Sequence, residues 1–72
     1  MDLDHLVKMA NQIGTFFESF PDADHASQEI ANHLTRYWAP PMRAALREHA
    51  ARTGTTSGLT PLVQQALTHL PG

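Results

Sequence analysis

Three side chains that could hold a metal or move a proton follow one another at helical spacing: His25, Glu29 and His33. Residues four apart lie on one face of an α-helix, so the three would form a stripe. A metal site needs a third or fourth ligand and, for catalysis, an open position. The chain has no His-Glu-x-x-His pattern. Because His25 and Glu29 fall on the polar flank of the expected helix, we interpret the stripe as solvated and predict no metal ligands.

Nucleophilic groups lack the neighbours that would activate them. The chain has no cysteine, which excludes thiol nucleophiles, disulfides and thiolate-bound zinc or iron–sulfur clusters. Ser19, Ser27 and Ser57 lack a nucleophile-elbow motif, and no glycine-rich loop follows a strand. His49 lies on the apolar side of its expected helix, which indicates a core-edge or interface histidine. We therefore predict no catalytic, cofactor-binding or metal-ligating residues and no enzyme activity of this chain alone.

Arg43 and Arg47 stand four residues apart beside an apolar helix face. Their stems could simply cover apolar surface while the charges stay in water. Their planar forks could instead bind carboxylates of a partner protein. Binding to a phosphate backbone is a third interpretation, which has less support because only Arg36 and Arg52 add nearby positive charge.

The elements that position these side chains are predicted to be four helices and no strands. Apolar residues recur at helical spacing and no stretch alternates with period two. The expected helices cover residues 2–19, residues 22–38 with Asp22 as N-cap, a segment from Pro40 or Pro41 to about Ala50, and a segment from the N-cap Thr60 to about Leu70. Residues 52–58 read as a flexible loop. The fold class is thus a small all-α bundle.

Aromatic residues and prolines meet at one corner, between Tyr37 and Arg43. Proline lacks an N–H group and clashes with a preceding helical turn, so a helix ending near Trp38 must stop there. Proline is tolerated in the first turn of a helix, so Pro40 and Pro41 can also begin the next one. The sequence predicts two helices joined at this corner.

Size and charge limit the possible functions. A chain of 72 residues forms one domain at most, here residues 1–72. A core of this size rarely supplies more than about 3–5 kcal/mol of stability without a disulfide, a metal or a partner. The net charge of −2 argues against a nucleic-acid-binding protein. An acidic start and the lack of a long apolar run lead us to expect a cytoplasmic protein without a membrane span.

The expected first helix carries more apolar surface than one neighbour can cover. Its apolar sector spans about half of its circumference, which is wider than the stripe of about 100° on an ordinary surface helix. Gly14 lies within this sector and would suit a close approach by another backbone. An exposed apolar remainder, together with aromatic residues, Met and Arg, is typical of a protein interface. We predict that the interface includes Phe16, Phe17, Tyr37, Trp38, Met42, Arg43 and Arg47.

Four segments carry a family resemblance, in order along nearly the whole chain. They are Met9-Ala10-Asn11-Gln12-Ile13-Gly14 with Phe16-Phe17, Ile30-Ala31-Asn32-His33-Leu34, Tyr37-Trp38-Ala39-Pro40-Pro41-Met42-Arg43, and Gly58-Leu59-Thr60-Pro61-Leu62-Val63 with Ala66-Leu67. Together they resemble the delta subunit of cytoplasmic NAD-dependent formate dehydrogenase. Pro41 departs from the pattern of that family, which typically has an arginine there.

The resemblance implies a small accessory subunit without a cofactor of its own, linked to assembly, cofactor insertion or stability of the complex. In such enzymes a large alpha subunit oxidises formate with a molybdenum or tungsten bis-pterin guanine dinucleotide cofactor and iron–sulfur clusters. Beta and gamma subunits carry FMN and further clusters and reduce NAD. The leading hypothesis is therefore a helical subunit that binds the alpha subunit and is completed by packing on it. A helical nucleic-acid-binding module and a homodimer are the alternatives.

Overall fold

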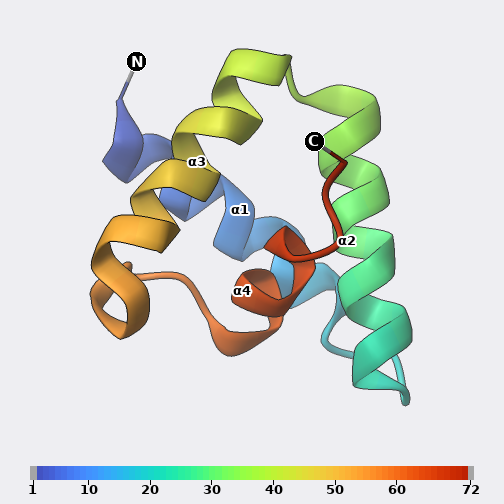
Figure 1. Cartoon of the computed structure of the whole chain (residues 1–72). Helices are drawn as coiled ribbons and strands as arrows, with labels where there is room; N and C mark the ends of the chain where they lie inside the picture. The colour runs from blue at the N-terminus through green and yellow to red at the C-terminus, as the bar shows by residue number, and fades with distance from the viewer. Residues whose placement is uncertain (1, 72) are drawn as a thin grey trace.

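Four α-helices make up most of the computed structural model, which describes residues 2–71 (Figure 1). No strand occurs within that range, so the all-α prediction is confirmed. A short 3₁₀ helix, η1 (Gly54–Thr56), follows the third α-helix. The α-helices are α1 (Leu3–Phe17), α2 (Ala23–Tyr37), α3 (Pro40–Thr53) and α4 (Pro61–Leu67).

The helix starts follow the capping residues. The Asp22 carboxylate accepts hydrogen bonds from the backbone N–H groups of Asp24 and His25, at 2.9 and 3.4 Å. The Thr60 hydroxyl accepts from the Val63 N–H at 3.4 Å, so both predicted N-caps are confirmed. Such bonds satisfy N–H groups that have no partner within their own helix.

The helix ends differ from the predictions by a few residues. α1 and α4 stop at Phe17 and Leu67, two and three residues earlier than expected. α3 continues to Thr53 and is followed by η1, where a flexible loop was predicted. The extra turn is held by the Thr53 hydroxyl, which donates to the His49 carbonyl at 2.7 Å. Composition alone does not reveal such side-chain-to-backbone bonds.

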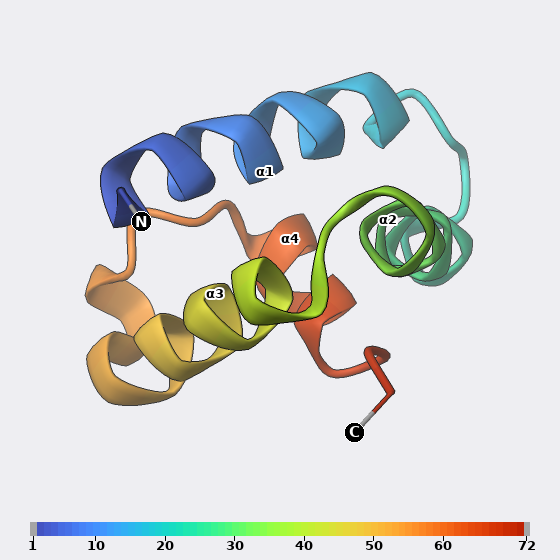
Figure 2. The same ribbon diagram turned by 90° about the horizontal axis from the view of Figure 1, so that it is seen from above.

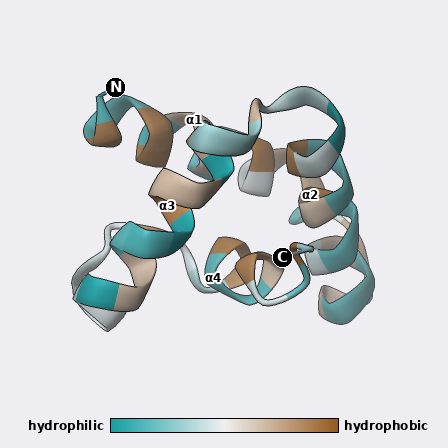
Figure 3. Ribbon diagram, turned by 45° about the horizontal axis from the view of Figure 1, so that its top comes forward, coloured by the Kyte–Doolittle hydropathy of each residue, from teal (hydrophilic) through white to brown (hydrophobic). Residues whose placement is uncertain are grey.

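The core lies where α1 meets the other three helices. In Figure 2, α2 is seen nearly end-on, whereas α1 and α3 lie along the plane of the picture. α1 packs against α2, α3 and α4, and α2 packs closely on α4. Figure 3 shows hydrophobic segments on α1 and α4 and a mostly hydrophilic outer side of α2. The largest fully buried apolar side chains are Ile30, Leu34, Leu46 and Val63.

Gly14 permits the close contact between α1 and α4. A Cβ atom at this position would lie 2.6 Å from Cγ2 of Val63, which is closer than real carbon atoms approach. The absence of a side chain therefore lets α4 sit directly against α1. The sequence predicted the close approach of another backbone at Gly14, whereas the atoms nearest to this position belong to the side chains of Val63 and Thr60.

Asn11 ties the segment before α4 to α1. Its Nδ2 donates to the Gly58 carbonyl at 2.9 Å, and its Oδ1 accepts from the Thr60 N–H at 3.1 Å. Gly58 has a positive φ of 84°, which favours glycine. The two polar groups of the Asn11 side chain thus hold residues 58–60, which lead into α4, against α1.

None of the helices within residues 2–71 is both long and apolar enough to span a bilayer.

Candidate protein-interaction surface

The predicted interface residues divide into a buried set and an exposed set. Trp38 belongs to the buried set: it is only 6% exposed and lies in the hydrophobic core. It is also the C-cap of α2, and its N–H donates to the Leu34 carbonyl at 3.0 Å. Pro40 and Pro41 then occupy the first positions of α3, so the predicted corner is confirmed.

The Arg43 side chain of α3 forms hydrogen bonds to the C-terminal end of α2 at this corner. Its Nη1 donates to the carbonyls of Leu34 and Thr35, both at 3.3 Å, and to the carbonyl of Trp38. These oxygens lie at the C-terminal end of α2, where the last carbonyls have no partner within the helix; the Leu34 carbonyl also accepts from the Trp38 N–H. A cation there also suits the negative end of the helix dipole.

Arg47 has a similar role one turn further along α3. Its Nη2 donates to the carbonyls of Leu70 and Pro71, at 2.9 and 3.1 Å, and so holds the segment after α4 against α3. Both arginines of the predicted interface therefore have acceptors within the chain. Whether they also contact a partner stays a prediction, as it does for the other five residues.

Phe16 and Tyr37 are the exposed members of the set. They are 73% and 68% exposed and are the large hydrophobic side chains that the described part of the chain leaves most open to water. Phe16 lies in the last turn of α1 and Tyr37 in the last turn of α2. The half-buried Phe17 packs edge-on to Phe16, with ring centres 5.0 Å apart. Met42 is half-buried against the core.

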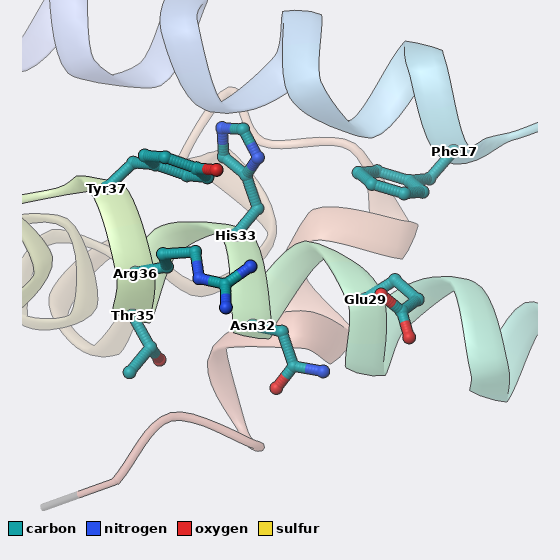
Figure 4. A pocket seen from close by; sticks show the side chains of 7 residues that line it. All are labelled: Phe17, Glu29, Asn32, His33, Thr35, Arg36 and Tyr37. Atoms are coloured by element: carbon teal, nitrogen blue, oxygen red, sulfur yellow. The ribbon is translucent and has the colours of Figure 1, made fainter.

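A shallow groove lies between α1 and α2 beside these rings. We call it the aromatic groove; it is lined by Met9, Gln12, Ile13, Phe16, Phe17, His33 and the mostly buried Trp38. A second, more polar hollow shares Phe17 and His33 with it. This polar hollow is lined by Phe17, Glu29, Asn32, His33, Thr35, Arg36 and Tyr37 (Figure 4). The two hollows therefore form one continuous surface with an apolar and a polar part.

The histidine stripe on α2 separates into two pairs. His25 Nε2 lies 3.5 Å from Glu29 Oε1, and the His33 ring lies 4.8 Å from the Tyr37 ring. Within residues 2–71, no group of three or more His, Asp or Glu side chains could hold a metal ion. His33 thus contributes a ring to the groove.

A Ser, His and Asp cluster that the sequence patterns did not reveal joins α2 to the end of α4. His69 Nε2 lies 3.2 Å from the Ser27 hydroxyl and 3.9 Å from Asp24 Oδ1. In a catalytic triad, the two ring nitrogens face different partners, one the nucleophile and one the carboxylate. Here a single nitrogen faces both, and Ser27 is fully buried. The cluster fastens two helices together.

A family comparison places these features in context. Residues 5–67 match the family model described as NADH-dependent formate dehydrogenase delta subunit FdsD. The chain belongs to this delta-subunit family. Neither a curated protein nor a solved structure matches it. The resemblance stated from the sequence is confirmed, and the matched range contains the corner, the aromatic groove and Asn11.

The hydrogen bond between Asn11 and Gly58 was not predicted from the sequence, although both residues lie in segments that resemble the family. Asn11 lies in the first resembling segment and its acceptor Gly58 opens the last one, 47 positions later. A polar residue in one family motif and a glycine in another are compatible with such a hydrogen bond. The internal role of Arg43 had no local signal, because its acceptors belong to the preceding helix.

Proposed function

We propose that this delta-subunit chain is a non-catalytic accessory subunit that binds the catalytic alpha subunit of an NAD-dependent formate dehydrogenase. The observation that carries the proposal is the exposure of Phe16, which lines the aromatic groove, and of Tyr37, which lines the adjoining polar hollow. The family name supports membership of a formate dehydrogenase. The alpha subunit is the proposed partner, within a complex that also contains beta and gamma subunits.

The energetic reason is the cost of leaving these two rings in water. An aromatic side chain can bury about 150–250 Å². At about 25 cal/mol per Å², covering the exposed parts of both rings would contribute several kcal/mol to binding. Aromatic side chains in such positions are typical binding hot spots. A partner that recognises only the folded chain also stabilises it by mass action.

The proposed role in the complex is assembly, cofactor insertion or stability. The molybdenum or tungsten cofactor, the iron–sulfur clusters and FMN would all reside in the other subunits, and NAD would be their substrate. The contribution of this chain would be binding energy directed at the alpha subunit. Its aromatic groove, and not a reacting group, would be its functional element.

Charge placement favours a protein partner over a nucleic acid. Arg43 and Arg47 donate to carbonyls of the chain itself. Arg36 and Arg52 are exposed but lie on different helices. A nucleic-acid surface uses a clustered set of cations, because each neutralised phosphate releases counterions. Light scattering on the purified chain would measure its molar mass and so distinguish a homodimer from a monomer that binds the alpha subunit.

Co-expression with a tagged alpha subunit tests the proposal. We expect the Phe16→Ala, Tyr37→Ala double variant to be recovered with the alpha subunit at least about tenfold less than the wild type, since each side chain is a hot-spot candidate. A control variant, Arg52→Ala with Thr55→Ala, changes two exposed residues outside the groove and should be recovered normally. Undiminished recovery of the double variant, with normal helix content by circular dichroism, would contradict the proposal.

A further inference from the structure

Arg36 differs from the two arginines of α3. Its side chain is exposed, lines the polar hollow and makes no hydrogen bond or ion pair with any residue in the range 2–71. Arg43 and Arg47, in contrast, donate to backbone carbonyls. In Figure 4 the guanidinium of Arg36 projects from α2 beside Tyr37 and His33. A planar fork of five donors is thus available next to an exposed aromatic ring.

The acid in the same hollow does not neutralise Arg36. Glu29 lies seven residues earlier on α2, which corresponds to about 10 Å along the helix axis. Its carboxylate faces His25 at 3.5 Å. The α1 side of the surface contributes only uncharged side chains to the lining: Met9, Gln12, Ile13, Phe16 and Phe17. The Tyr37 end of the surface therefore carries an unopposed positive charge.

We infer that the aromatic groove and the polar hollow together receive an amphipathic segment of the catalytic subunit that carries an Asp or Glu opposite Arg36. Apolar side chains of that segment lie on Phe16, Phe17 and Ile13. Its carboxylate accepts a forked pair of hydrogen bonds from the guanidinium, a geometry that arginine favours. This inference rests on the proposed function and adds the chemistry of the partner segment to it.

Neighbouring groups suit a carboxylate at this position. The Asn32 amide and the Tyr37 side chain line the same hollow and bring further hydrogen-bond donors. A single guanidinium beside an apolar groove matches one acidic side chain on an apolar segment. Opposite charges at an interface chiefly set orientation and association rate, so Arg36 would fix the direction in which the segment lies.

A charge-reversal comparison tests the pairing. The probe is a purified, immobilised complex of alpha, beta and gamma subunits that lacks the delta chain, and binding is measured at low and high salt. We expect Arg36→Glu to weaken binding at low salt by about tenfold or more and to reduce its dependence on salt, because like charges then face each other. Arg52→Glu, which changes an exposed arginine outside both hollows, is the matched control and should bind like the wild type.

A zero-length cross-link identifies the partner group. In the Arg36→Lys variant, carbodiimide should join the introduced amine to an aspartate or glutamate of the alpha subunit, and the cross-linked peptide should be amphipathic. The Arg52→Lys variant should give no such product.

The outcomes separate this inference from the proposal on which it rests. If Phe16→Ala weakens binding while Arg36→Glu binds like the wild type at both salt concentrations, the acidic segment is wrong and the docking groove stands. If neither variant weakens binding, both are wrong. A cross-link from the Arg36→Lys variant to an acid within a uniformly polar segment would also overturn the inference.

Discussion

Two adjacent aromatic residues illustrate the difference between the buried core and the exposed surface. Trp38 is 6% exposed and Tyr37 is 68% exposed, although one peptide bond separates them. The arginines differ in the same way: Arg43 donates to three carbonyls, whereas the Arg36 guanidinium has no acceptor within residues 2–71. Aromatic and arginine content therefore does not by itself mark an interface. Internal hydrogen bonding distinguishes the residues that hold the fold from those that remain available.

The corner needs its arginine for a structural reason. The last carbonyls of α2 have no partner within the helix. Pro40 and Pro41 stand four residues after Arg36 and Tyr37 and have no N–H groups to offer to those two carbonyls. Arg43, three residues after Pro40, donates to the carbonyls of Leu34, Thr35 and Trp38 at this end of α2.

Trp38→Ala should have the largest effect on stability. Removal of a buried aromatic side chain costs about 3–5 kcal/mol, which is comparable to the whole stability expected of so small a core. We expect the variant to be mostly unfolded by circular dichroism in the absence of a partner. The matched variant Tyr37→Ala should change the free energy of unfolding by less than about 0.5 kcal/mol. Equal effects of the two changes would remove the distinction between the buried core and the exposed surface.

Arg43→Ala should have a smaller but clear effect. Loss of hydrogen bonds from a charged donor to half-buried carbonyls costs about 1–3 kcal/mol. Urea denaturation would measure the difference in the free energy of unfolding. Arg36→Ala on the same surface should lie within about 0.5 kcal/mol of the wild type. A stable Arg43→Ala protein would show that water can satisfy the end of α2 and that Arg43 is free to bind elsewhere.

Asn11→Ala should have the smallest effect of the three. It leaves the Gly58 carbonyl and the Thr60 N–H without their bridge, at a cost of about 1–2 kcal/mol. The neighbouring Gln12→Ala removes an exposed amide that lines the groove and should leave thermal stability unchanged. Asn11→Asp keeps the acceptor for Thr60 but places a carboxylate oxygen against the Gly58 carbonyl, so its melting temperature should also fall below that of the wild type. A melting temperature equal to that of the wild type for Asn11→Ala would argue against the bridge.

Periodicity and capping chemistry predicted most of the fold from the sequence. Asp22, Thr60 and the double proline set helix boundaries through local bonds, which residue type and order reveal. The exposed Phe16 was also foreseeable, because it lies at one edge of an apolar sector too wide for one neighbour. The acceptors of Arg43, Arg47 and Asn11 were not foreseeable in this way. Each depends on which backbone groups the tertiary fold leaves unpaired nearby, and side-chain type does not encode that.

The most direct test is the affinity of folded groove variants for the complex of alpha, beta and gamma subunits. Biolayer interferometry with purified wild type and the Phe16→Ala, Tyr37→Ala variant would measure the dissociation constants. We predict a weakening of about 30-fold or more, the equivalent of at least one hot spot of about 2 kcal/mol, with an unchanged melting temperature of the free chain. A dissociation constant within about twofold of the wild type would contradict the assignment of the aromatic groove and the adjoining polar hollow as the docking surface.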